Sequence, residues 1–466
     1  MNTLQSPNLA NPSFLTPAHR TLRTRSAALL CASLLTAGPA LHAQSVWTGG
    51  SGAWDSNGSP GWNGTGVPNS MGASVNKTDS TSATITQNNS SGVTIGSFTL
   101  SGGAGTFGVT LSNALTFNQD GGGAGTAAIT NAGSNASSRV NFGSGTLTLA
   151  DDILISNTGS STNASGSIAI SSTIGGAGNV TFSNLSNSAS AGHITLSGPN
   201  TFTGTVTVQK GAVTFSNATS LGSSANAVYL GSAGNSATLV SSSNSVTHAY
   251  NITVVSTVGT NVLGSINTST SDTTYSGTLA LNGNVTLASS KTGVGAVRYT
   301  GAISGGGNVT LSGTGRTQFG DGAASVTNTY TGNTVLSETS SFLLADNAKM
   351  TFVIGASGLN NKISGTGGQA ATLNGDFVFD LTNAAANGSW TIVDLGTVNG
   401  TFGSTFSITG FTEAANVWTY VSGTTTYTFT EATGVLSAVP EPSTAVLWGV
   451  GLAFVLFGIR RRMRHA

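Results

Sequence analysis

Short runs that alternate apolar and polar residues recur along most of the chain, and they restrict its fold more than any other feature. Examples are Val93 to Leu100 (VTIGSFTL), Gly145 to Leu149 (GTLTL), Thr205 to Val208 (TVTV) and Phe377 to Leu381 (FVFDL). Alternation of period two, bounded by Gly, Asn and Ser, is typical of β-strands. The sequence therefore predicts an all-β body built from many short strands.

Several of these runs also repeat one another at offsets of about 130 residues. Three pairs of segments align: Ile168–Ser183 with Val297–Ser312, Asn200–Val208 with Asn328–Leu336, and Ser144–Leu149 with Ser276–Leu281. A shorter unit, G-N-V-T, occurs at Gly178, Gly283 and Gly307. A unit of one or two strands and a turn cannot bury its own apolar face, so such units must stack on one another.

Stacking predicts a β-solenoid, and we expect a right-handed parallel β-helix with turns of roughly 20 to 30 residues. Inward Val, Ile, Leu and Phe would fill the core, glycine would permit corners with positive φ, and Asn and Thr would stack in ladders between turns. A string of β-sandwiches is the alternative, since regular strand spacing permits that fold too.

Parts of the chain resemble proteins with autotransporter-associated β-strand repeats. Trp47 to Asp55 (WTGGSGAWD) and Gly61 to Asn69 (GWNGTGVPN) resemble their N-terminal module, and Gly192 to Gly222 resembles their core repeat. We expect residues 44–70 to form an aromatic N-terminal cap, 71–371 the solenoid repeats and 372–438 a C-terminal β cap. Caps are needed because the open end of a stacked sheet invites pairing with other chains.

The N-terminal 43 residues have the pattern of a secretory signal peptide with a polar extension over residues 1–19. Arg20, Arg23 and Arg25 precede the apolar run Ala27–Leu35, and a small-residue site favours cleavage by signal peptidase between Ala43 and Gln44. Cys31, the only cysteine, lies within this segment. We therefore expect an exported mature chain without disulfides.

Residues 439–466 carry three signals in a fixed order. Val439, Pro440, Glu441 and Pro442 form a proline-flanked acidic motif, an uncharged apolar run extends from Ala445 to Ile459, and the cluster Arg460, Arg461, Arg462 and Arg464 follows. A helix over 443–459 would measure roughly 25 Å, and snorkelling arginines would extend it enough to span a bilayer. The arginines predict a membrane stop with the C-terminus in the cytoplasm.

This order resembles the PEP-CTERM sorting signal of Gram-negative bacteria. The resemblance implies recognition by an exosortase-type enzyme and cleavage near Pro440 to Pro442. It also implies passage through an inner-membrane intermediate to the cell envelope, outer surface or exopolysaccharide matrix, which makes exopolysaccharide an expected partner.

The body between these signals is poor in charge. Between Gln44 and Val439 there are 8 basic and 14 acidic residues, and 6% of the whole chain is charged. A basic patch for nucleic acid is missing from this segment, so we expect no nucleic-acid partner.

The residue pattern predicts no catalytic site, metal site or cofactor. His193 and His248 lie in strand-like runs, Asp151 and Asp152 should point to opposite faces of a strand, and Asp376 and Asp380 would lie about 13 Å apart. That separation exceeds what a glycosidase pair requires. Asp120 and Asp321 precede glycines but lack the regular calcium-binding repeat. Arg139, Arg298 and Arg316 are far from the acidic residues in sequence.

We therefore expect a non-enzymatic structural or adhesin-like protein of the cell surface or matrix, because acid–base catalysis needs poised titratable groups. The alternative is a carbohydrate-active enzyme, a polysaccharide lyase or hydrolase, on the same β-helix. A cleft that gathers three or more acidic and basic side chains would favour this alternative.

Overall fold

A computed structural model describes residues 44–55, 61–64, 66–103, 105–120, 125–164, 166–255, 259–365, 367, 369–398, 400–441 and 460. Between Gln44 and Glu441 the described residues form strands, turns and loops, and no helix. Nowhere in the described part of the chain is a helix both long enough and apolar enough to cross a membrane. The membrane helix expected over 443–459 lies outside the described residues.

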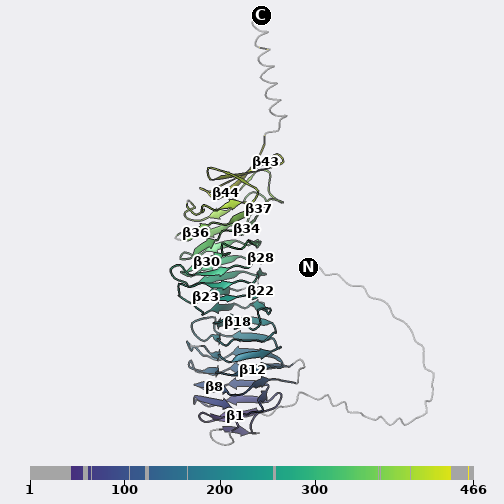
Figure 1. Cartoon of the computed structure of the whole chain (residues 1–466), viewed down its shortest axis with the longest axis vertical. Helices are drawn as coiled ribbons and strands as arrows, with labels where there is room; N and C mark the ends of the chain where they lie inside the picture. The colour runs from purple at the N-terminus through teal and green to yellow at the C-terminus, as the bar shows by residue number, and fades with distance from the viewer. Residues whose placement is uncertain are drawn as a thin grey trace, which may run out of the picture. The chain divides into compact units, whose positions relative to one another are not determined.

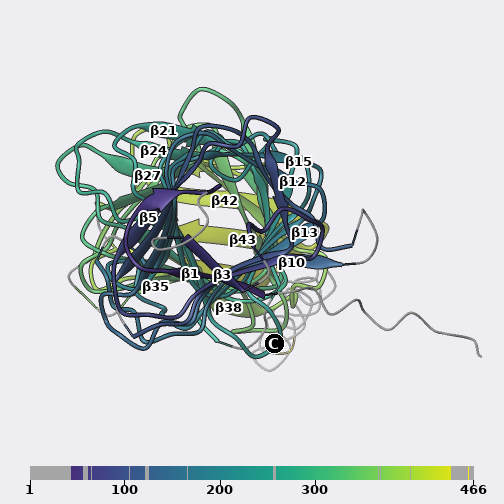
Figure 2. The ribbon, with the colours of Figure 1, turned by 90° about the horizontal axis from the view of Figure 1, so that it is seen from below.

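The strands wind into a β-solenoid with three faces, as predicted (Figures 1 and 2). Face A holds β1 (Gln44–Thr48), β4 (Ser74–Lys77), β7 (Ser97–Leu100), β10 (Thr126–Asn131), β13 (Asp152–Asn157), β16 (Val180–Asn184), the first half of β18 (Val206–Phe215), β19 (Ala227–Leu230), β22 (Asn251–Val254), β25 (Leu279–Leu281) and β28 (Ile303–Gly305). It continues through β31 (Val326–Asn328), β34 (Ala348–Val353), β37 (Asp376–Asp380) and β40 (Ser407–Ile408).

Face B holds β2 (Gly52–Ala53), β5 (Ala83–Gln87), β8 (Thr106–Leu111), β11 (Arg139–Phe142), β14 (Ile168–Ile170), β17 (Ile194–Leu196), the second half of β18, β20 (Ala237–Ser241), β23 (Asn261–Ser265), β26 (Val285–Ser289), β29 (Val309–Ser312), β32 (Thr334–Leu336), β35 (Ile363–Gly365) and β39 (Val393–Asp394). Face C holds β6 (Val93–Ile95), β9 (Leu115–Phe117), β12 (Thr146–Leu149), β15 (Thr173–Gly176), β21 (Val246–His248), β24 (Thr273–Tyr275), β27 (Ala296–Tyr299), β30 (Arg316–Phe319), β33 (Ser341–Leu344) and β36 (Ala370–Leu373).

Strands on each face pair in parallel with the strand one turn away, which excludes the alternative of separate β-sandwiches. One turn takes the chain from Ile194 to Val213 at its shortest and from Phe107 to Val140 at its longest, roughly the 20 to 30 residues expected. The parallel turns extend beyond residue 371, because β37 and β40 still pair in register.

The segments that repeat in sequence do not lie on the same face. Ile168–Ser183 supplies β14, β15 and β16 on faces B, C and A, whereas Val297–Ser312 supplies β27, β28 and β29 on faces C, A and B. The offset therefore corresponds to whole turns plus one face. The repeating unit is one side of the cross-section with its corner, and the same unit can serve on any face.

The G-N-V-T unit has a physical explanation at every position. A Cβ on Gly307 would lie 2.0 Å from the carbonyl oxygen of Gly283 in the turn before, so only glycine allows the corners to stack this closely. The next residue, Asn308, accepts the backbone N–H of Asn333 on its side-chain oxygen at 2.7 Å and so joins two turns. Val309 is fully buried, and Thr310 follows on the outside.

Inward residues form a continuous core with ladders of like side chains. On face C the rings of His248, Tyr275, Tyr299, Phe319 and Phe342 follow one another at centroid distances between 5.1 and 6.1 Å. Asn131, Asn157 and Asn184 occupy one buried column on face A. The asparagine column confirms that polar ladders can lie within the solenoid when their amides are bonded, since Asn157 donates to the side-chain oxygen of Asn184 at 2.9 Å.

The first turn is covered by three tryptophans. β1 pairs antiparallel with β3 (Gly61–Gly64), and Trp62 lies between Trp47 and Trp54 with centroid distances of 4.9 and 5.1 Å. The indole N–H of Trp47 donates to Gly50 O at 2.8 Å and that of Trp54 to Pro68 O at 3.2 Å. Their polar atoms are therefore satisfied although the rings are buried.

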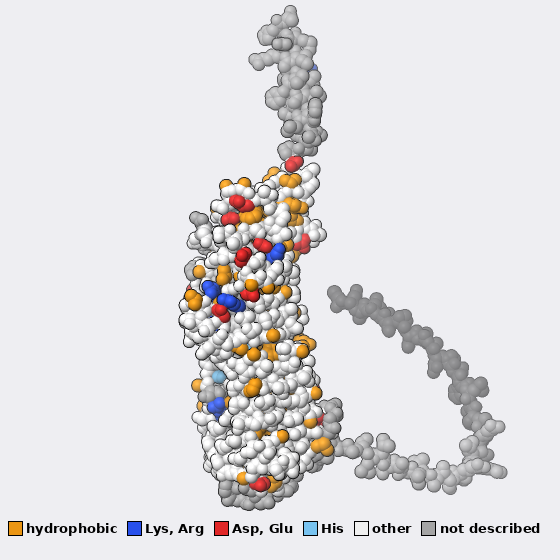
Figure 3. All heavy atoms as spheres, viewed as in Figure 1, with side chains coloured by type: hydrophobic (Ala, Val, Ile, Leu, Met, Phe, Trp, Pro, Cys, Tyr) orange, Lys and Arg blue, Asp and Glu red, His pale blue; other side chains and the backbone are white. Residues whose placement is uncertain are grey.

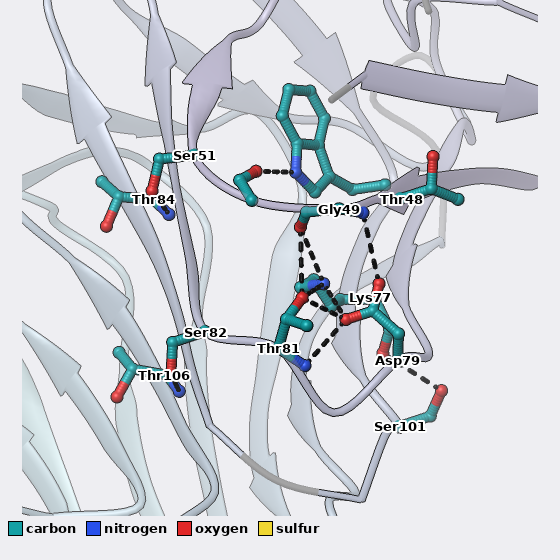
Figure 4. A network of polar contacts seen from close by, with 12 residues as sticks. Thr48, Gly49, Ser51, Lys77, Asp79, Thr81, Ser82, Thr84, Ser101 and Thr106 are labelled. Carbon is teal, nitrogen blue, oxygen red and sulfur yellow. Dashed lines mark hydrogen bonds and ion pairs between the residues drawn. The ribbon is translucent and has the colours of Figure 1, made fainter. Parts of the chain in front are cut away.

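A buried lysine ties this end of the solenoid together (Figure 4). The Lys77 side chain is fully buried, and its Nζ contacts Asp79 Oδ1 at 2.5 Å, Thr81 Oγ1 at 3.2 Å and Gly49 O at 3.3 Å. Partial burial raises the pKa of Asp79, but hydrogen bonds from Lys77 and Thr81 outweigh it and bring the pKa down to about 2. The charge of this lysine is thus compensated within a structural network.

Candidate sorting site

The C-terminal sheet is the antiparallel element that precedes the predicted sorting motif. Its strand order is β38 (Gly388–Thr391), β44 (Val435–Pro440), β43 (Thr425–Thr430), β42 (Val417–Ser422) and β41 (Thr412–Ala414). In Figure 1 it lies at the opposite end of the solenoid from β1. Its position beyond the last parallel turns is that of a cap.

One face of this sheet packs against the phenylalanines at the end of the solenoid. Phe429 is fully buried and lies 6.1 Å from Phe377 and 5.7 Å from Phe402, ring centroid to ring centroid. Trp418 packs edge-on against Phe406 at 5.5 Å and donates its indole N–H to Glu431 at 2.7 Å. The sheet thereby removes the apolar end of the solenoid from water.

The last strand, β44, changes from a buried to an exposed environment along its length. Leu436 and Ala438 are buried and lie in the part of β44 that pairs with β38 on one side and β43 on the other. Pairing with β38 ends at Ala438, and Val439 beyond it is 61% exposed. The strand therefore emerges from the fold at the residue where the motif begins.

The motif itself starts as an edge strand. Val439 and Pro440 are in register with Thr426 and Thr425 of β43, and the Glu441 N–H donates to Thr424 O at 2.6 Å. Proline lacks an N–H and suits a strand edge that must not recruit another chain. Val439, Pro440 and Glu441 are exposed at the surface while their backbone is still held by the C-terminal sheet.

The other residues of the predicted processing sites are only partly described. Gln44 is exposed and is the first residue of β1, whereas Ala43 lies outside the described residues. Arg460 is described and exposed. Pro442, Arg461, Arg462 and Arg464 lie outside the described residues.

The acidic residues considered for catalysis take part in structural contacts. Asp151 is buried and accepts the backbone N–H of Gln119 at 2.5 Å, whereas Asp152 is exposed and accepts that of Asn179 at 2.8 Å. The two carboxylates point to opposite sides, as expected from their adjacent positions. Asp376 contacts Lys349 at 3.5 Å.

Both histidines of the body are enclosed. Burial lowers the pKa of His248 to about 4, and its Nε2 lies 3.1 Å from Ser241 Oγ. Burial, and to a lesser extent the positive charge of Arg139, also lowers the pKa of His193. Within the described ranges, no group of three or more His, Cys, Asp or Glu side chains is placed to hold a metal ion.

Folding brings one acid and one arginine together that are separate in sequence. Arg298 contacts Asp272 at 2.7 Å, and Arg316 donates to Val294 O at 2.5 Å. These residues lie on the surface of face C, and much of the surface seen in Figure 3 carries no charge. The arginine and the carboxylate of this pair are used by each other.

The sequence did not indicate a hollow of about 510 Å³ beside the C-terminal sheet. Phe379, Asp380, Phe411 and Tyr420 are among the residues that line it. They come from β37, the loop after β40 and β42, and no local pattern joins these segments before the chain folds.

Comparison with known proteins gives one match, which falls on this end of the chain. No curated protein and no solved structure matches the sequence. The family profile of the PEP-CTERM protein-sorting motif matches residues 438–462, which begin at Ala438, where β44 leaves the buried part of the C-terminal sheet.

Proposed function

We propose that the protein is a non-enzymatic structural component of the bacterial cell surface or extracellular matrix. The PEP-CTERM motif implies export, surface sorting and processing by an exosortase-type enzyme. The β-solenoid suits a structural or adhesin-like role, because a stack of turns presents an extended surface without requiring a catalytic cleft.

One observation carries the proposal: the sorting motif begins where the C-terminal sheet ends. Val439 to Glu441 are exposed, yet Pro440 is still in register with Thr425. A processing enzyme can reach the motif without unfolding the solenoid. Cleavage after Glu441 would leave the whole C-terminal sheet with the released protein.

The alternative of a polysaccharide lyase or hydrolase has less support. Such catalysis needs a base and an acid that face a substrate. Asp272 and Arg298 instead neutralise each other, and Asp151 accepts backbone N–H groups from a neighbouring turn. We therefore assign no catalytic role to these residues.

The test is the location and intact mass of the protein in its own host. We expect an outer-surface or secreted species that begins at Gln44 and lacks the residues after about Pro442. In the Glu441→Gln variant we expect unprocessed protein to accumulate in the inner membrane. Glu338→Gln, which changes an exposed glutamate of the solenoid, is the matched control and should be processed normally.

An inner-membrane species that keeps its arginines in the unmodified protein would contradict the proposal. So would equal processing of the Glu441→Gln variant and the control at every time point after synthesis, because the motif would then have no role in recognition.

A further inference from the structure

The hollow beside the C-terminal sheet arises because one hairpin extends past the core. Along β42, Trp418 is 8% exposed and Tyr420 is 37% exposed, although both side chains lie on the same side of the strand. The space between Tyr420, the end of β37 and the loop before β41 has a volume of about 510 Å³. This is the size of a small-ligand site.

Aromatic rings form one wall of this hollow. Phe379 and Phe411 are 5.5 Å apart between ring centroids, and Phe411 and Tyr420 are 5.3 Å apart with planes tilted by 34°. Phe379 is buried, Phe411 is half-buried and Tyr420 is exposed. The rings therefore offer a rigid apolar surface that is already partly open to water.

A carboxylate and hydroxyl groups lie in the same hollow. Asp380 Oδ1 accepts the Thr382 hydroxyl at 2.6 Å and the Thr382 backbone N–H at 3.1 Å. The hydroxyl bond and then the backbone bond hold the pKa of Asp380 below its usual value, so the carboxylate is ionised at neutral pH. Both bonds go to Oδ1, which leaves Oδ2 to accept donors from a ligand. Ser422 adds a further hydroxyl to the lining.

The edge of β42 beside this hollow is also open. β41 pairs with β42 only as far as Thr419, so among the described residues no strand covers that edge at Tyr420 and beyond. Backbone donors and acceptors at this position can therefore contribute to binding.

We propose that this hollow binds neutral hexose units of a polysaccharide. The apolar face of a sugar ring would stack on Tyr420 and Phe411, and ring hydroxyls would donate to Asp380. A uronate or sulfate group would be repelled by the same carboxylate. The proposal rests on the proposed surface or matrix location, which would bring the protein into contact with such polymers.

The full chain, extracted in detergent, is titrated with cellohexaose, maltohexaose and mannohexaose by isothermal calorimetry, and with polygalacturonate as the acidic comparison. We expect at least one neutral hexasaccharide to bind with a Kd between about 10 μM and 1 mM. Tyr420→Ala and Asp380→Asn should each weaken this binding about tenfold or more.

Two matched controls separate the hollow from general effects. Val421→Ala changes the exposed neighbour of Tyr420, whose side chain points to the other side of β42. Asp321→Asn changes a carboxylate that likewise accepts the N–H two residues ahead, at Ala323, but lies in another loop. Both controls should bind as the unmodified protein does, and circular dichroism should be the same for all four variants.

Absence of binding to all three neutral hexasaccharides overturns the proposal. Tighter binding of polygalacturonate, or full binding by Tyr420→Ala, overturns it as well. These results leave the proposed function standing if the protein is still sorted to the surface, whereas retention in the inner membrane contradicts the proposed function independently of any sugar binding.

Discussion

At the residue scale, the solenoid depends on a few positions where two turns come unusually close. Glycine occupies corners where any side chain would meet a carbonyl of the preceding turn, as at Gly204 over Gly178 and Gly332 over Gly307. The G-N-V-T repeat could be recognised in the sequence as a turn. Its reason could not, because the clash partner of each glycine is about 25 residues away along the chain and becomes a neighbour only after stacking.

Replacing Gly307 with alanine should destabilise the protein, whereas replacing Gly306 should not. A Cβ at Gly307 would lie 2.0 Å from a backbone oxygen, but a Cβ at Gly306 meets nothing within 4 Å. We expect Gly307→Ala to lower the free energy of unfolding by about 1–3 kcal/mol and Gly306→Ala to change it by less than about 0.5 kcal/mol. Urea unfolding followed by tryptophan fluorescence gives the two midpoints, and equal midpoints would contradict this explanation.

Stability should fall as the pH drops from about 6.5 to 4, in part because of His248. Burial holds its pKa at about 4 in the folded chain, below the ordinary 6.5 of an unfolded histidine. The unfolded chain therefore binds the extra proton in this window, and stability is complete above it. The loss from His248 is about 2 kcal/mol at pH 5.

His248→Phe should reduce this pH dependence. Phenylalanine suits the site, because Phe215 and Tyr275 flank the imidazole at centroid distances of 4.4 and 5.4 Å. Denaturant midpoints at pH 7, 6 and 5 give the slope for each protein. Some slope should remain, since the pKa of His193 is also lowered by burial. An unchanged slope in the variant would show that His248 is not the group responsible.

At the element scale, period-two alternation sufficed to predict short parallel strands and turns of roughly 20 to 30 residues. The face on which each strand lies could not be predicted, because all three faces carry similar residues, such as Val180 on face A, Val309 on face B and Val297 on face C. The C-terminal sheet was also beyond prediction in its strand order. It pairs β38 with β44, which are distant in sequence, and places β39 of face B between them along the chain.

Deleting one complete turn should preserve the fold. Removal of residues 279–302 joins Thr278 to Ile303, which lies directly over Leu279, and places β22 against β28 and β23 against β29. We expect unchanged β-sheet circular dichroism per residue and a cooperative thermal transition. Deletion of residues 279–290 alone shifts every later strand off its face and should yield protein that limited proteolysis digests. Equal protease resistance of the two deletions would contradict the turn as the structural unit.

At the scale of the whole molecule, the two ends of the solenoid are closed by different means. Three tryptophans and Lys77 cover the first turn, and an antiparallel sheet covers the last. The sequence indicated aromatic enrichment near both ends and the motif at 439–442. It gave no indication of the hollow at Tyr420, since that site joins three segments that only the complete cap brings together.

A chain that ends at Gly410 should self-associate. This truncation uncovers Phe377, Phe402 and Phe406, which now pack against Phe429 or Trp418 of the C-terminal sheet. An exposed apolar end with unpaired strands is a template for another copy. Size-exclusion chromatography with light scattering should show oligomers for residues 44–410, whereas residues 44–441 serve as the capped control. A monodisperse truncated chain of monomer mass would show that the sheet is dispensable as a cover.

The parallel stacking has a mechanical consequence. Strands run across the solenoid axis, so the hydrogen bonds between turns point along it. A pull between a tail held at β44 and an attachment near β1 would load the bonds of one turn at a time instead of shearing many at once. Each turn that peels away would release roughly 80 Å of chain. Under tension the protein would therefore lengthen in steps and dissipate work, behaving as an extensible tether and not as a brittle strut.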